Sequence, residues 1–332
     1  MSTIKSSAEN LTLNADGANN DIIFQSNGTT KATLDQAGLF TATSFAGNGA
    51  NLTGISSVTT LGGLTDVTMD IANFTDSLLI QPNSDGSAPT TGTLSNALYN
   101  IGIGKSTFAA LTSGDFNVGL GYNSLAADTT GSQNTSLGAN SMLVNTTGSD
   151  NVSVGYDSLK ANTTGTENVS VGANSLELNT TGGFNVAVGE RALAYNTTAN
   201  YNIAMGKKAL WKNTTGASNV AIGHEALKTN TTASSNTSIG YASMLANTTG
   251  SDNAAFGANA LTTNTTASSN SAFGYHALRY NTTGYDNTAM GMNALTTNTI
   301  GFRNTALGKS ALKSNTTADY NTGLGFEALE GV

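Results

Sequence analysis

One spacing constrains this chain more than any other feature: an Asn stands shortly before a Gly, at positions 0 and +4, once in every seventeen positions. Fourteen such pairs follow one another from Asn100 to Asn321, and no insertion or deletion disturbs the interval. A loop-rich globular protein tolerates length changes in its turns, whereas stacked copies of one structural unit keep a fixed period. The register predicts a solenoid of about fourteen 17-residue coils over residues 100–332.

Numbering each copy from its Asn as position 0 separates fixed positions from variable ones. Position +4 is Gly in all fourteen copies, +3 is always large and apolar, and +8 is Leu or Met in all but the first copy. Position +2 is Ala, Ser or Gly throughout, +7 is Ala or Ser after the first copy, and most copies carry Asn-Thr-Thr at +11 to +13. We expect the side chains at the fixed positions to face neighbouring coils or the interior of the coil.

The pattern predicts two strands in each coil. Positions 0 to +4 read as a short strand with +1 and +3 on one face and 0 and +2 on the other, and Gly at +4 ends this strand. A second extended segment is expected to run through +8 into Asn-Thr-Thr. Strands of successive coils would stack in parallel about 4.8 Å apart. The expected fold class is therefore all-β, a parallel β-roll or β-helix with a smaller β-rich N-terminal region.

Identical residues one coil apart should form columns along the solenoid axis. Asn side chains at 0 and +11 are expected to hydrogen-bond to the Asn of the neighbouring coil, which satisfies polar groups that are costly to bury alone. An unbroken Asn column then needs no catalytic role. The predicted ladder residues are Asn117, Asn134, Asn151, Asn168, Asn185, Asn202 and Asn219, with Gly121, Gly138, Gly155, Gly172 and Gly189 at +4.

The composition suggests that one copy of the chain is not enough. Only 10% of the 332 residues are charged, and 38 are Gly. Ordering one residue costs about 1–2 kcal/mol of backbone entropy, whereas a coil offers two or three large apolar side chains worth about 1.5–3 kcal/mol each. The deficit predicts that surface is also buried between chains, and we expect a homotrimer.

Charge and motifs argue against several classes of protein. The net charge of −8 would repel a phosphate backbone, so nucleic acid is not an expected partner. No apolar run approaches the membrane-spanning length of about 18 residues. The N-terminus also has no apolar signal core, so we expect neither membrane insertion nor export by a leader. Acidic residues are scattered over variable positions, and His224 and His276 lie three coils apart. We therefore expect no catalytic residue, no metal site, no cofactor and no enzymatic activity.

Three copies of the repeat carry a family resemblance. The segments Asn151–Leu159, Asn185–Leu193 and Asn219–Leu227, NVSVGYDSL, NVAVGERAL and NVAIGHEAL, resemble the head repeat of trimeric autotransporter adhesins of the YadA type. The resemblance implies a left-handed parallel β-roll, a trimer and a surface-binding role. The heads of that family usually have shorter coils, and the added Asn-Thr-Thr turn is similar to a variant common in bacteriophage tail fibres.

Residues 1–99 favour the bacteriophage tail fibre over the autotransporter adhesin. Leu11–Gly17 and Ile22–Gly28 read as strands joined by Asn, Asp and Gly turns. Ser44–Ile55 and Leu61–Val67 resemble segments of phage tail fibres. We expect residues 1–57 to be a β-rich attachment region, 58–99 a connecting segment and 100–332 the roll.

The expected protein is a structural and adhesive fibre of a phage virion, located on the tail or a similar appendage and assembled in the host cytoplasm. Its expected partners are two further copies of itself, other tail or baseplate proteins through the N-terminal region, and a glycan or protein receptor on the host surface. The alternative is the head fragment of a bacterial trimeric surface adhesin. A polysaccharide depolymerase or an ice-binding protein is a weaker alternative.

Receptor contact is expected at the variable positions +5, +6, +9, +10, +15 and +16, because aromatic side chains there can stack on sugar rings. The alternative for each is a solvated turn residue that packs on its neighbour. The candidate binding residues are Tyr122, Tyr156, Tyr195, Trp211, Tyr241, Tyr275 and Tyr280.

Overall fold

The computed structural model describes residues 22–26, 29–34, 40–42, 67–71, 73–81 and 91–331, with side chains described for 73–81 and 91–331. The chain separates into two compact units, residues 1–59 and 60–332. Every described element is a β-strand.

The first unit contains a three-stranded antiparallel sheet in the order β1-β2-β3. Its strands are β1 (Ile22–Ser26), β2 (Thr29–Leu34) and β3 (Phe40–Ala42). Strand β1 confirms the strand expected within residues 22–28. The strand expected at residues 11–17 and the fibre-like segment at residues 44–55 lie outside the described residues, as does nearly all of the segment at 61–67.

The second unit begins with an antiparallel hairpin and continues as one long parallel sheet. Strands β4 (Val67–Ile71) and β5 (Phe74–Ile80) form the hairpin, and β5 pairs in parallel with the first repeat strand. Each repeat then supplies one three-residue strand at positions +1 to +3. These are β6 (Ile101–Ile103), β7 (Val118–Leu120), β8 (Thr135–Leu137), β9 (Val152–Val154), β10 (Val169–Val171), β11 (Val186–Val188), β12 (Ile203–Met205), β13 (Val220–Ile222), β14 (Thr237–Ile239), β15 (Ala254–Phe256), β16 (Ser271–Phe273), β17 (Thr288–Met290), β18 (Thr305–Leu307) and β19 (Thr322–Leu324).

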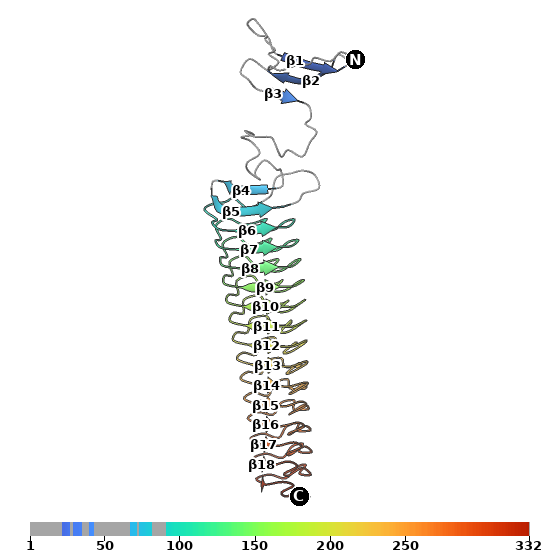
Figure 1. The fold of residues 1–332 in the computed structure, drawn as a ribbon. Helices are drawn as coiled ribbons and strands as arrows, with labels where there is room; N and C mark the ends of the chain where they lie inside the picture. Colours follow the sequence, from blue (N-terminus) through green and yellow to red (C-terminus); the bar gives the residue numbers. More distant parts are fainter. Residues whose placement is uncertain are drawn as a thin grey trace. The chain divides into compact units, whose positions relative to one another are not determined.

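The register confirms the predicted solenoid. Each repeat strand pairs in parallel with the equivalent strand of the next copy, as Val169 does with Val186 and Val171 does with Val188. Figure 1 shows these strands stacked rung upon rung along the second unit, with the rest of each coil looping beside them. Equivalent residues of successive coils therefore form columns, as the constant interval predicts.

The prediction of a second strand in each coil is wrong. Positions +5 to +10 form turns, and the residues at +6 and +8 have left-handed backbones, for example Asp157 with φ 53° and Leu159 with φ 48°. An extended strand keeps φ negative, so these two residues bend the chain where a strand was expected. The turns still bond to their neighbours, because Leu159 N–H donates to Ser175 O at 3.0 Å in the next coil.

The interior of the roll is thin and is filled by positions +2, +7 and +8. The Leu, Met or Phe at +8 is fully buried in each of the first thirteen coils, and the small residues at +2 and +7 pack beside it. The +1 and +3 side chains point to the outer face, as the burial pattern of β9 shows. The small +2 and +7 positions thus allow close approach across the thin coil.

The two ends of the roll differ in how they are covered. At the first coil, β5 supplies the neighbouring strand, and its Phe74 and Leu79 are fully buried. In the last coil, Leu329 occupies the +8 position but is 48% exposed, and Leu324 at +3 is 72% exposed. The interior packing of a coil therefore depends on having a coil or strand on both sides.

Candidate functional site

The Asn column at position 0 forms the predicted ladder. Asn168 N–H donates to Asn151 Oδ1 at 3.0 Å, and the Asn168 amide Nδ2 donates to Asn151 Oδ1 at 3.1 Å and to Gly182 O at 2.9 Å. The column is almost entirely buried from Asn100 to Asn304. Each Asn thus joins two coils and also holds the end of its own coil.

The Asn column at +11 forms a second ladder that shares an acceptor with the first. Asn162 Nδ2 donates to Asn145 Oδ1 at 2.8 Å in the preceding coil and to Gly165 O at 3.0 Å in its own coil. Asn151 Nδ2 donates to the same Gly165 O at 2.9 Å. The carbonyl at +14 therefore fastens both columns, which is a structural role for both regularly spaced Asn residues of the repeat.

Position +4 requires Gly for two reasons. Gly155 has φ 140°, a backbone that side chains disfavour, and a Cβ there would lie 2.6 Å from the carbonyl oxygen of Gly172. The same approach recurs between Gly172 and Gly189. The Gly column predicted as a ladder is thus a close backbone contact between successive coils.

Asp128 interrupts the second Asn column. Its carboxylate Oδ1 accepts a hydrogen bond from Asn145 Nδ2 at 2.8 Å, whereas its Oδ2 is buried without a partner among the described residues. The residue one coil earlier in the same column is Leu111, which offers no polar group. Burial raises the pKa of Asp128 from 3.8 to about 8, against the smaller opposite effects of the hydrogen bonds from Asn145 and the Gly131 backbone.

The seven candidate binding residues lie on the turns, not in the interior. Tyr122, Tyr156, Tyr241 and Tyr275 are all at +5 and are each at least half exposed. Tyr241 stacks on His224 one coil before it, and Tyr275 stacks on His276. The structure does not gather the seven into one site, because they are spread over coils from residue 122 to residue 280.

Two of the seven lie together in a cluster that the sequence reasoning did not assemble. Tyr195 meets Trp211 edge to face, with ring centroids 5.4 Å apart. The ammonium groups of Lys208, Lys212 and Lys228 lie 5.5, 5.6 and 5.9 Å from the Trp211 ring centroid. The repeat interval could have identified two of these lysines, because Lys228 follows Trp211 and Lys212 follows Tyr195 by one coil.

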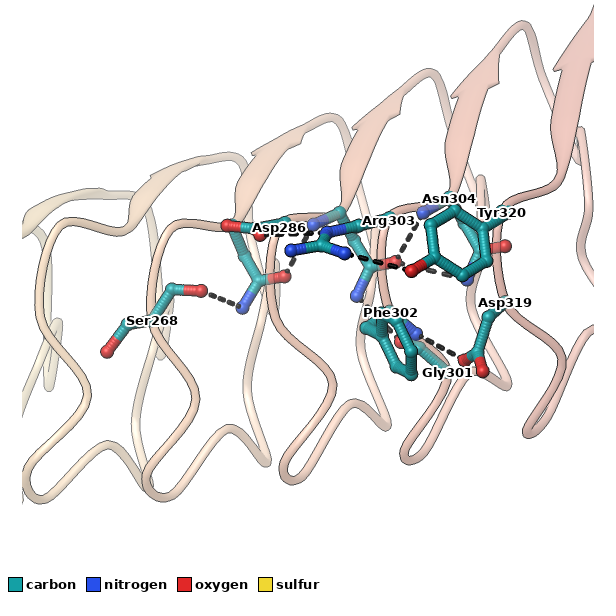
Figure 2. Close-up of polar contacts among 10 residues, drawn as sticks. Ser268, Asp286, Gly301, Phe302, Arg303, Asn304, Asp319 and Tyr320 are labelled. Atoms are coloured by element: carbon teal, nitrogen blue, oxygen red, sulfur yellow. Dashed lines mark hydrogen bonds and ion pairs between the residues drawn. The ribbon is translucent and has the colours of Figure 1, made fainter.

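A second exposed cluster lies near the C-terminal end of the roll. Figure 2 shows Arg303 between Asp286 and Tyr320, residues at +16 in three successive coils. Its Nη1 donates to Tyr320 Oη at 2.9 Å and its Nε donates to Asp286 Oδ2 at 3.4 Å. Phe302 N–H donates to Asp319 Oδ1 at 2.9 Å beside it. Because Arg303 already has a carboxylate and a phenol as partners, this cluster is largely satisfied within the chain.

The outer face of the long sheet carries an apolar column. The residue at +3 is large and apolar in all fourteen coils and is buried in none of them. Leu120, Met205 and Leu307 are 44%, 42% and 45% exposed. Contiguous apolar surface of this kind is typical of a contact with another macromolecule.

Comparison with known proteins gives no assignment for this chain. No family model matches it, and neither the curated proteins nor the solved structures contain a match. Within the described residues, no helix is long and apolar enough to cross a membrane. The same residues contain no group of three or more His, Cys, Asp or Glu side chains that could hold a metal ion.

Proposed function

We propose that this protein is a structural and adhesive fibre of a phage virion, in which three copies of the chain form the fibre and contact the host cell surface. The observation that carries the proposal is the division of the repeat between inside and outside. The buried positions 0, +2, +7, +8 and +11 are nearly constant, whereas positions +5, +6, +9 and +10, which are exposed or half-buried in most coils, vary and carry aromatic and charged side chains. A constant interior suits a rigid rod, and a variable exterior suits recognition.

The apolar column at +3 is the proposed contact between the three chains. It runs the whole length of the roll, and an apolar side chain gains about 25 cal/mol for each Å² that it removes from water. Association around a threefold axis would bring the same face of each chain together, as closed rings of identical subunits do. The N-terminal region would then join other tail or baseplate proteins.

Binding to the host would depend on many copies of the same weak contact. Three chains with exposed aromatic residues in many coils offer a receptor many weak contacts at once, and linked contacts raise the overall affinity without any single strong one. The proposed receptor is a glycan or a protein on the host surface.

The first test is the mass of the purified chain in sedimentation equilibrium. A trimer has three times the 33.6 kDa of one chain, and electron micrographs should show an elongated particle with threefold symmetry. A monomer at micromolar concentration would overturn the trimer.

A pair of variants locates the contact. Leu120→Lys combined with Met205→Lys places charge on the +3 column and should shift the protein towards monomer, because an unpaired charge is costly to bury. The control Ala173→Lys combined with Ala258→Lys places the same two charges at +5 positions, away from the +3 column, and should leave the trimer intact. Equal behaviour of both proteins would show that the chains meet elsewhere.

The virion assignment is tested by location. Gold-labelled antibody against the roll should mark the tail or an appendage of particles made from a genome that carries this gene. Label on a bacterial cell surface and not on particles would favour the surface adhesin instead.

A further inference from the structure

Trp211 is the only Trp of the chain, and it lies at the centre of a positively charged cluster. Lys208, Lys212 and Lys228 all approach its ring, and Tyr195 packs against it from the preceding coil. Ammonium groups are attracted to the face of an indole, by about 0.5–1 kcal/mol at exposed sites. The three lysines are thus gathered around one aromatic ring before any ligand arrives.

The charge of this cluster opposes that of the chain as a whole. Residues 190–228 contain five Lys or Arg and two Glu, a net charge of +3, whereas the whole chain carries −8. Both Glu residues are already paired, Glu190 with Lys207 at 2.8 Å and Glu225 with Lys228 at 2.7 Å. Lys208 and Lys212 form no ion pair with any described residue. An acidic ligand is therefore attracted to this segment and repelled by residues 100–189, which contain two Lys and six Asp or Glu, a net charge of −4.

The cluster lies on the turns, away from the residues proposed for chain association. Trp211 and Lys228 occupy position +9, Lys212 and Tyr195 occupy +10, and Lys208 occupies +6, whereas the apolar contact face uses +3. Tyr195 is 44% exposed and Trp211 is half-buried. The cluster therefore combines accessible aromatic surface with unpaired positive charge.

We propose that Trp211, Lys208, Lys212 and Lys228, with Tyr195 beside them, bind the carboxylated sugar units of an acidic polysaccharide. The inference rests on the proposed function, whose receptor class it narrows. Aromatic side chains pack on the apolar faces of sugar rings, and ammonium groups recognise the carboxylates. Nucleic acid is the competing polyanion, and a single-stranded oligonucleotide that binds more tightly than polygalacturonate would overturn the assignment to sugars.

The unique Trp reports binding directly. Titration of the full-length protein with polygalacturonate should change the fluorescence of Trp211, and the effect should weaken as salt is raised. Fully methyl-esterified polygalacturonate has the same sugars without the charge. It should bind at least about tenfold more weakly, a difference of about 1.4 kcal/mol, because the lysines lose their charged partners. Equal binding of the two polymers would overturn the proposal.

Matched variants assign the response to the cluster. Lys208→Gln combined with Lys212→Gln should weaken polygalacturonate binding by about tenfold or more, while Lys160→Gln combined with Lys313→Gln removes two lysines from distant coils and should change it little. Thermal unfolding of each variant checks that the roll is intact. Unchanged affinity in the first pair would overturn the site.

Two further outcomes separate the alternatives. Dextran sulfate that binds as tightly as polygalacturonate would show a general anion site and overturn the assignment to carboxylated sugars. The mass of the protein used in the titration distinguishes the two proposals: failure to bind by a trimer overturns this inference alone, whereas binding by a monomer supports this inference and overturns the trimeric fibre.

Discussion

Two sections of the roll fill the same interior with different chemistry. Between Ser124 and Ser175 the small buried positions +2 and +7 are Ser, and between Ala187 and Ala226 the same positions are Ala. The strands of both sections keep the same parallel register. In the serine section, each hydroxyl bonds to the next, as Ser141 does to Ser153 and Ser153 does to Ser158, both at 2.8 Å.

The difference shows that the interior accepts either a connected chain of hydroxyls or alanine. A single serine coil also fits, because the hydroxyls of Ser238 and Ser243 donate to the carbonyls of Ser243 and Ala255 at 2.8 and 3.3 Å. A buried hydroxyl without a partner costs about 1–3 kcal/mol, and a hydroxyl that both donates and accepts avoids that cost. The serine chain continues through Ser136, Ser158 and Ser170 with oxygen separations of 2.6–2.8 Å. In the serine section each hydroxyl thus depends on the next for a partner, whereas the alanines of the other section need none.

The largest expected effect falls equally on both sections, because both depend on Gly at +4. Gly155→Val in the serine section and Gly223→Val in the alanine section should each lower the free energy of unfolding by about 4 kcal/mol. Left-handed strain costs about 1–3 kcal/mol, and the overlap with the next coil adds a similar amount. In both, the added Cβ would lie 2.6 Å from a carbonyl oxygen. Denaturant unfolding measures the change.

The last coil supplies the control for this substitution. Gly325 also has a positive φ, of 120°, but no atom lies within 4 Å of a Cβ built there. Gly325→Val should therefore keep only the backbone strain, and its cost should be lower by at least about 1 kcal/mol. A loss as large as that of Gly155→Val would contradict the role assigned to the contact between coils.

The second effect concerns Asp128, a buried carboxyl group next to the start of the serine section. Its folded pKa of about 8 exceeds the ordinary 3.8, so folding favours the protonated form. The stability that it contributes is fully present below pH 3.8 and is lost as the pH rises through about 8, by about 1.4 kcal/mol per unit between these values. The first coils can open locally without unfolding of the whole roll, and opening exposes Asp128 to water. The measured loss of stability should therefore not exceed about 2 kcal/mol.

Asp128→Asn should remove this pH dependence. The equivalent Asn145 donates its amide to the carbonyl of Gly148 at 2.9 Å, and a protonated Asp128 can donate to Gly131 in the same way. Thermal unfolding at pH 5 and pH 8.5 compares the two proteins. The original chain should lose more stability at the higher pH than the Asn variant does, and parallel pH profiles would exclude a protonated Asp128.

The third effect tests the serine chain directly. Ser153→Ala should cost about 1–2 kcal/mol, because Ser141 loses its side-chain acceptor and Ser158 loses a donor. Replacing by Ala all seven buried serines at +2 and +7 from Ser124 to Ser175 converts the section to the chemistry of Ala187–Ala226 and should restore most of that loss. Denaturant unfolding of both variants gives the comparison. If the sevenfold variant lost as much stability as seven separate Ser→Ala changes, the serine and alanine interiors would not be equally stable.

Much of this architecture is predictable from the sequence because columns repeat. The 17-residue interval fixes which residues meet one coil apart, so the Asn and Gly ladders followed from the sequence alone. The second strand was predicted wrongly because a left-handed backbone is rare for Leu, which occupies +8 in most coils, and because +6 varies from Asn and Asp to Arg, Lys and Glu. Only the geometry of the turn reveals that Asp157 and Leu159 adopt it.

The candidate site was less predictable than the fold. Trp211 and Tyr195 were identified from the sequence as candidate binding residues, but their cationic neighbours were not. Lys228 is found by adding one period to Trp211, whereas Lys208 approaches the ring only because the +5 to +10 segment is a tight turn. A turn brings residues three apart in sequence to one side chain, and an extended strand would have separated them.

The smallest expected effect again compares the two sections at a position where they agree. At +12, the hydroxyl of Thr180, in the last coil that carries residues of the serine section, donates to Thr197 O at 2.9 Å, and that of Thr231, in the last coil that carries residues of the alanine section, donates to Thr248 O at 3.1 Å. Thr180→Val and Thr231→Val should each cost about 1 kcal/mol, since the side chain keeps its shape and loses one hydrogen bond.

The adjacent threonines at +13 are the matched control for the same change. Thr181 and Thr232 are exposed, and neither hydroxyl makes a hydrogen bond to a described residue. Thr181→Val and Thr232→Val should therefore change the free energy of unfolding by less than about 0.5 kcal/mol. Equal losses at +12 and +13 would mean that the Thr column does not hold the coils together. Unequal losses at Thr180 and Thr231 would mean that the residues at +2 and +7 affect the strength of the hydrogen bond at +12.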